Sequence, residues 1–104
     1  MLVTRYSGCW RIADMGEHFA IPITMHNVGH VLQNAMTAQF AASTRNFVMT
    51  ETNIGVGPVH EEFIKEKLEV KDGMLKVPTG PGIGVTPIEA AIKENRMPGE
   101  PWWD

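Results

Sequence analysis

The strongest constraint on the fold is a strand–helix–strand pattern between residues 21 and 50. Residues 21–25 (IPITM) are almost entirely apolar, which is typical of a strand covered on both faces. Residues 31–42 are rich in alanine and repeat apolar side chains every three or four positions, which predicts a helix. Residues 47–50 (FVMT) predict a second strand. Strands joined by such a helical crossover run parallel, so the pattern predicts an α/β fold.

The flanking segments predict further elements. Apolar residues at helical spacing predict a helix over residues 9–19, before the first strand. Residues 52–58 are rich in glycine and predict a loop, and residues 59–68 predict a short charged helix. An Asp-Gly pair inside residues 69–77 predicts a two-residue hairpin, because a type I′ turn needs positive φ at both positions.

The last helix should begin at a capping box. Thr86 is a suitable N-cap, Pro87 suits the first helical position and Glu89 completes the box, so the helix is predicted to run to about Asn95. The tail that follows carries two tryptophans, which we expect to anchor it.

Composition excludes several classes of function. The 104 residues carry a net charge of −3, with 9 Lys and Arg against 12 Asp and Glu, which argues against a nucleic-acid partner. No apolar run approaches the roughly 20 residues of a membrane span, so no membrane partner is expected. No secretory leader is recognisable, and the single cysteine, Cys9, cannot form an internal disulfide. Both observations predict a reducing, cytoplasmic location.

Two titratable residues follow the predicted strands. His26 comes directly after the first strand and Glu51 directly after the second, so both should lie at the same rim, where parallel α/β folds place their chemistry. Imidazole is suited to proton transfer near neutral pH. Taken singly, each side chain would more commonly hydrogen-bond the loop that follows it. The other acids are expected to be solvated.

Two weaker patterns are set aside. His26 and His30 form an HxxxH pair, but Gly29 indicates a loop rather than the helix on which such a pair could bind zinc, so no metal ligand is predicted. Residues 80–84 (GPGIG) are rich in glycine, yet their spacing is not that of a phosphate-binding loop and Pro81 removes an amide, which predicts a rigid turn.

Four segments, taken together and in this order, carry a family resemblance. They are residues 11–17 (RIADMGE), 21–27 (IPITMHN), 41–51 (AASTRNFVMTE) and 72–85 (DGMLKVPTGPGIGV). As a set they resemble the mandelate racemase and acid-sugar dehydratase branch of the enolase superfamily. The last segment is similar to the DG-x-x-x-VP-x-x-PG-x-GV motif of that branch.

The resemblance implies a C-terminal fragment of a modified (β/α)8 barrel. Residues 1–58 would supply its last two parallel strands with their helices, and residues 59–104 the C-terminal return, which contributes to the capping domain. His26 matches the base that moves a proton at the carbon next to a substrate carboxylate. Glu51 matches the acid that hydrogen-bonds the developing enediolate. The implied substrate is a carboxylate such as an acid sugar, and the implied reaction is dehydration or racemisation.

The same resemblance implies that much of the site lies elsewhere. Family members hold Mg²⁺ with three carboxylates on earlier strands and orient the histidine with an aspartate, and no segment of this chain matches them. We therefore expect the isolated chain to bind no Mg²⁺ and to be inactive, with His26 lacking a partner that fixes its tautomer. Unpaired strand edges predict self-association or pairing with the missing barrel portion. The alternative function is a non-catalytic α/β scaffold or oligomerisation fragment.

Overall fold

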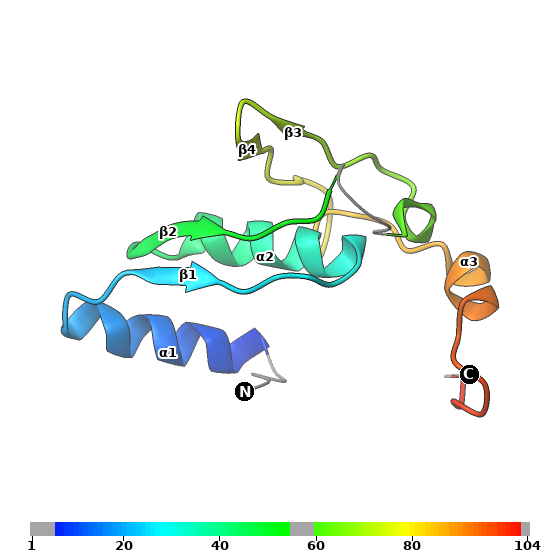
Figure 1. Ribbon diagram of the computed structural model, residues 1–104, viewed down its shortest axis with the longest axis horizontal. Coiled ribbons are helices and arrows are strands. Elements are labelled where there is room, and N and C mark those ends of the chain that lie inside the picture. Colours follow the sequence, from blue (N-terminus) through cyan, green and yellow to red (C-terminus); the bar gives the residue numbers. More distant parts are fainter. Residues whose placement is uncertain (1–5, 55–59, 103–104) are drawn as a thin grey trace.

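A parallel pair of strands lies at the centre of the computed structural model, which describes residues 6–54 and 60–102. Strand β1 (Ile23–Met25) pairs with β2 (Phe47–Thr50) through helix α2 (Val31–Ser43), as the sequence pattern predicts. Helix α1 (Tyr6–His18) precedes β1. The chain thus has the α/β architecture of a barrel fragment, with one β–α–β unit and an additional helix (Figure 1).

The register of the strand pair sets the geometry of its carboxyl end. Ile23 pairs with Phe47 and Met25 with Thr50, with one irregularity after Ile23. The backbone N–H of Glu51 still donates to the carbonyl of Met25 at 3.1 Å, so the pairing continues past the end of β2. The residues that follow the two strands therefore leave the sheet side by side.

Helix α1 is held against the rest of the fold by polar contacts. The Tyr6 hydroxyl donates to the carbonyl of Met36 at 2.9 Å, and the Trp10 indole donates to the Ser43 hydroxyl at 3.0 Å, which joins α1 to α2. Asn46, just before β2, donates to the carbonyls of Ala13 and Ile21. These contacts fix α1 relative to α2 and to the strand pair.

Helix α2 is buried on more than the single stripe that its sequence predicts. The first turns of α2 pack against the C-terminal half of the chain, and the two together form one hydrophobic cluster. Its Gln39 side chain donates to the carbonyls of Pro78 and Ile83, which holds the glycine- and proline-rich segment 78–84 in place. The buried members of the cluster are Val31, Ala35, Phe63, Ile64, Leu68 and Val85.

The C-terminal half confirms the predicted hairpin. Strands β3 (Val70–Lys71) and β4 (Met74–Leu75) are antiparallel, and Asp72 and Gly73 between them have φ of 52° and 74°. In Figure 1 this hairpin projects at the top, whereas the terminal helix α3 (Glu89–Glu94) lies at the opposite end of the C-terminal half.

Two local predictions in this half are wrong, and a contact between distant segments explains both. The predicted helix 59–68 is only the short 3₁₀ helix η1 (Glu61–Phe63), while residues 55–59 lie outside the described part. Ile64 instead bridges antiparallel to Pro87, and the N–H of Ile88 donates to the carbonyl of Phe63 at 2.7 Å. An extended backbone is required for this pairing.

The predicted capping box is the second wrong prediction. The hydroxyl and N–H of Thr86 donate to the Glu66 carboxylate at 2.8 and 2.6 Å, so Thr86 does not cap α3, which begins at Glu89. The same hydrogen bonds, the backbone one first, lower the pKa of Glu66. Glu66 is exposed, as expected, and its hydrogen bonds also join two segments of the C-terminal return.

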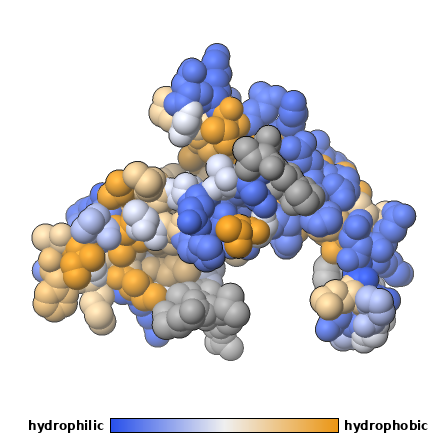
Figure 2. Space-filling model, in the orientation of Figure 1, coloured by the Kyte–Doolittle hydropathy of each residue, from blue (hydrophilic) through white to orange (hydrophobic). Residues whose placement is uncertain are grey.

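Large apolar side chains remain exposed around the strand pair. The first strand was expected to be covered on both faces, yet Ile21, just before β1, is exposed. Val48 and Met49 of β2 are exposed as well, as are apolar residues of α1 that the helical spacing predicts to be buried. Figure 2 shows hydrophobic side chains gathered over the end of the molecule that holds α1, β1 and β2. The exposed apolar residues of this region are Ile12, Met15, Phe19, Ile21, Val48 and Met49.

No helix in residues 6–54 and 60–102 is long and apolar enough to cross a membrane.

Candidate active site

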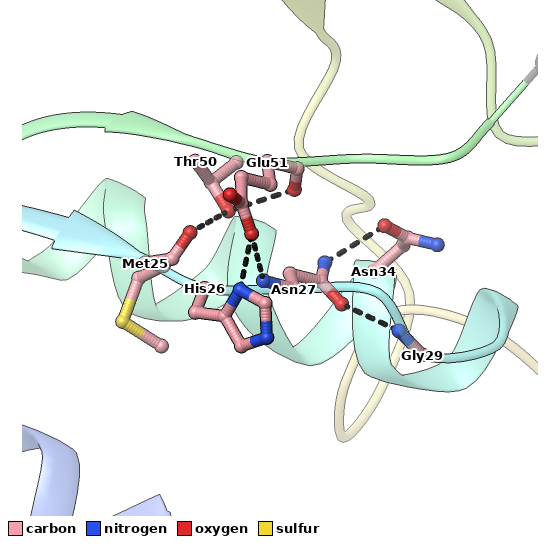
Figure 3. A network of polar contacts seen from close by, with 7 residues as sticks. All are labelled: Met25, His26, Asn27, Gly29, Asn34, Thr50 and Glu51. Carbon is pink, nitrogen blue, oxygen red and sulfur yellow. Dashed lines mark hydrogen bonds and ion pairs between the residues drawn. The ribbon is translucent and has the colours of Figure 1, made fainter.

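The structure brings His26 and Glu51 into direct contact. Each residue follows its strand immediately, and the parallel register places both at the same end of the sheet. Nδ1 of His26 lies within hydrogen-bond distance of Oε2 of Glu51 (Figure 3). The rim predicted from the sequence is therefore formed by these two side chains.

The contact defines which imidazole nitrogen carries the hydrogen. Oε2 of Glu51 also accepts a hydrogen bond from the backbone N–H of Asn27 at 3.3 Å, so this oxygen acts as an acceptor. A carboxylate oxygen only accepts, so in the neutral ring Nδ1 of His26 donates to it and Nε2 is left as the basic nitrogen. We expected the tautomer of His26 to be uncontrolled in this chain, but Glu51 itself supplies the partner.

Both side chains are open to solvent in this chain. The His26 side chain is 78% exposed and that of Glu51 60% exposed. Enzymes that move protons from carbon surround the reacting groups with protein to exclude water. The two side chains are of the kinds found in proton-transfer sites, but residues 6–54 and 60–102 do not shield them from water.

His30 takes a different position from the one a metal pair would need. It immediately precedes α2, and its ring contacts that of Phe63 edge to face, with centroids 5.9 Å apart. Partial burial of His30 lowers its pKa, and the nearby His60 lowers it further, so the neutral form of His30 is favoured. Within the described residues, no group of three or more His, Cys, Asp or Glu side chains could hold a metal ion.

His60 was expected to lie in a polar helix and is placed otherwise. It occupies a left-handed turn, with φ of 53°, and its ring stacks on Phe63 at a centroid distance of 4.7 Å. Its Nδ1 also pairs with the Glu62 carboxylate at 3.1 Å. His60 therefore contributes to packing at the start of the C-terminal return, whereas His18 is exposed on α1.

Sequence reasoning missed the polar residues behind the pair. Asn27 and Asn34 are each only 1% exposed, and Nδ2 of Asn27 donates to Oδ1 of Asn34 at 2.8 Å. Asparagines in a loop and in a helix usually face solvent, so nothing in the local pattern marks these two. The available signal was their position, since Asn27 follows His26 directly.

Titratable residues at the carboxyl ends of parallel strands are typical of α/β barrels and of open α/β sheets. The model of the enolase C-terminal domain-like family matches residues 4–91. This chain belongs to that family. The match covers α1, the strand pair, the hairpin and the start of α3.

The individual relatives that the chain matches are longer proteins. It is 29% identical to a D-xylonate dehydratase from Haloferax volcanii over 94 residues, which are 90% of this chain and 23% of the relative. Among solved structures, a mandelate racemase/muconate lactonizing enzyme-like protein from Rubrobacter xylanophilus matches 92% of this chain and 25% of its own, at 28% identity and a TM-score of 0.75.

A second solved structure carries ligands. It is a putative L-alanine-DL-glutamate epimerase from Burkholderia xenovorans bound to magnesium and fumarate, which matches 86% of this chain and 22% of its own, with 25% identity and a TM-score of 0.67. The chain thus spans about a quarter of the length of the relatives it matches. Its homologues include both acid-sugar dehydratases and racemase- or epimerase-type proteins.

Proposed function

We propose that this chain is the C-terminal part of an enolase-superfamily enzyme that removes a proton from the carbon next to a carboxylate. His26 is the base, and Glu51 is the acid that hydrogen-bonds the enediolate through a proton on Oε1, while its Oε2 faces His26. The observation that carries the proposal is the contact of these two side chains at the carboxyl ends of adjacent parallel strands, in a chain of this family. The substrate class is an acid sugar, as for the dehydratase relative.

In this proposal, each proton step belongs to a particular atom of the pair. Because Nδ1 of His26 faces Glu51, Nε2 takes the proton as the C–H bond breaks, and the electron pair passes into an enediolate. In dehydration, the imidazolium returns that proton to the hydroxyl on the next carbon, which leaves as water. The resulting enol then becomes a 2-keto-3-deoxy acid. In racemisation, a proton instead returns to the same carbon.

The residues of this chain do not fit a magnesium site by themselves. Mg²⁺ prefers an octahedral set of oxygen ligands. Oε2 of Glu51 is engaged by His26 and the N–H of Asn27, and no acidic cluster lies beside Glu51 in the described part of the chain. We therefore derive no step through the metal, and in this proposal the ligands for Mg²⁺ belong to the remainder of the barrel.

The test is a chimera in which this chain replaces the matching C-terminal segment of the Haloferax volcanii dehydratase. We expect the chimera to exchange the substrate α-proton in D₂O and to form the 2-keto-3-deoxy product with Mg²⁺. The isolated chain should give neither signal, because its His26–Glu51 pair is exposed to water and the proposed Mg²⁺ ligands belong to the rest of the barrel.

Two outcomes would contradict the proposal. A chimera that folds and assembles like the parent dehydratase but exchanges no α-proton would favour the non-catalytic scaffold. Product formed by the isolated chain above the level of its His26→Ala variant would show that the fragment is active alone.

We also propose that the isolated chain associates with a second copy of itself. Among the described residues, β1 and β2 pair only with each other, and the apolar side chains of Val48 and Met49 in β2 are exposed. Unpaired strand edges next to an apolar surface favour pairing with another chain. Size-exclusion chromatography with light scattering should give a mass at least twice the 11.6 kDa of one chain.

Charged substitutions in β2 should reduce this association. The double variant Val48→Lys, Met49→Lys is expected to shift the population toward monomer, because lysines on an edge disfavour strand pairing. The matched control is Met97→Lys, which changes a methionine after α3 that is 72% exposed, against 62% for Met49. A wild-type chain that is monomeric at every concentration would refute the proposal.

A further inference from the structure

A buried amide lies directly behind the His26–Glu51 pair. Asn34 is on the first turn of α2, its side chain is enclosed, and it carries no charge. Buried amides are nearly always hydrogen-bonded, and one left unsatisfied costs free energy. The partners of Asn34 therefore show what its position requires.

One oxygen of Asn34 joins the two loops of the site. Oδ1 accepts hydrogen bonds from Nδ2 of Asn27 at 2.8 Å and from the hydroxyl of Thr52 at 3.0 Å. Asn27 is the residue after His26, and Thr52 is the residue after Glu51. A single atom on α2 thus fixes the chain immediately beyond each member of the pair.

The contacts on either side extend this connection. Oδ1 of Asn27 accepts from the N–H of Gly29 at 3.4 Å (Figure 3), and the Thr52 hydroxyl accepts from the N–H of Ile54 at 3.2 Å. Nδ2 of Asn34 donates to the carbonyl of His30 at 3.4 Å. Each loop is therefore held at more than one point, and Asn34 is common to both.

We propose that Asn34 is a positioning residue that sets the contact between His26 and Glu51. Its two hydrogen bonds hold the backbone N–H of Asn27 toward Oε2 of Glu51, which keeps that oxygen in place for Nδ1 of His26. The inference rests on the proposed function of the pair, but its geometry can be tested without turnover.

The test uses ¹⁵N-labelled full-length chain and NMR. Long-range ¹H–¹⁵N spectra report which nitrogen of His26 carries the hydrogen. In the wild type we expect Nδ1–H, whereas Asn34→Ala should shift the ring toward the Nε2–H form that free imidazole side chains favour. The amide protons of Asn27 and Ile54 should exchange at least about 10-fold faster relative to that of Phe40, since the opening is local.

Three further variants separate positioning from general stability. Thr37→Val changes another buried polar residue of α2, one turn away, and should leave the His26 spectrum unchanged. Asn34→Asp retains an acceptor for both loops and should preserve the Nδ1–H form. Thr52→Val removes the hydrogen bond on the Glu51 side alone and should shift the tautomer partly, which keeps the test informative if Asn34→Ala does not fold.

An unchanged His26 tautomer in Asn34→Ala, or in Thr52→Val if only that variant folds, would overturn the positioning role. So would equal acceleration of all core amides, because that pattern means a purely structural role. An inactive chimera, by contrast, would overturn the proposed function without altering these spectra.

Discussion

Replacing His26 by Asn in the active chimera should reduce turnover by about 10³-fold, within the range of roughly 10²–10⁴ that a positioned general base contributes. The amide side chain fills similar space and can still hydrogen-bond Glu51, but it cannot take a proton from carbon. Product formation and α-proton exchange in D₂O measure the loss. Because both reactions need the same proton transfer, they should fall together.

The control for this substitution is His18→Asn, at an exposed histidine on α1 whose Nδ1 lies 2.8 Å from the carbonyl of Asp14. We expect it to leave the rate within about twofold of the parent chimera, since it lies outside the site. A His26→Asn chimera that retains full exchange would remove His26 from the mechanism. Loss of product with retained exchange would instead confine His26 to the departure of the hydroxyl.

Phe40→Ala should destabilise the isolated chain by about 3–5 kcal/mol, the usual cost of emptying a buried phenylalanine site. The Phe40 side chain is only 1% exposed, and its ring lies 6.1 Å from that of Trp10, between α2 and α1. Small domains have about 5–15 kcal/mol of stability in total. The substitution should therefore remove a large part of the free energy of unfolding, which urea denaturation followed by circular dichroism measures.

Phe19→Ala makes the same chemical change at an exposed site. Phe19 is 72% exposed, so its truncation leaves no internal cavity and should change the unfolding free energy by less than about 0.5 kcal/mol. Similar losses at the two positions would mean that Phe40 does not contribute to a packed core in solution. The experiment should be run below the concentration at which the chain associates.

The order of elements around the site was predictable because it depends on local signals. The apolar strands and the alanine-rich helix between them place His26 and Glu51 at one rim through parallel pairing alone. The Asp-Gly turn was predictable for a similar reason, because its two residues tolerate the positive φ that the hairpin demands. Each of these features is determined within a few residues.

The features that failed depend on residues distant in sequence. Thr86 has every local property of an N-cap, yet Glu66, 20 residues earlier, accepts both of its hydrogen bonds. The segment after His60 has helical composition, but pairing of Ile64 with Pro87 extends it. Local propensity is a weak preference that such tertiary contacts override.

The exposed apolar surface illustrates a different limit. Periodicity grouped Ile12 and Met15 of α1 with Phe19, just past the end of the helix, and it predicted that this apolar face is buried. A hydrophobic pattern shows that a helix face is suited to burial, but it does not show whether the residues that bury it belong to the same chain. Here the described residues leave that face open, as expected for a segment spanning about a quarter of its relatives.

The hairpin offers a practical consequence. Its turn is so open that a Cβ added at Gly73 would meet no atom within 4 Å, and Figure 1 shows the turn well apart from the strand pair. Exposed tips of this kind tolerate insertions. A fluorescent label attached at Asp72 would therefore follow docking of the chain onto a barrel partner without touching the His26–Glu51 pair.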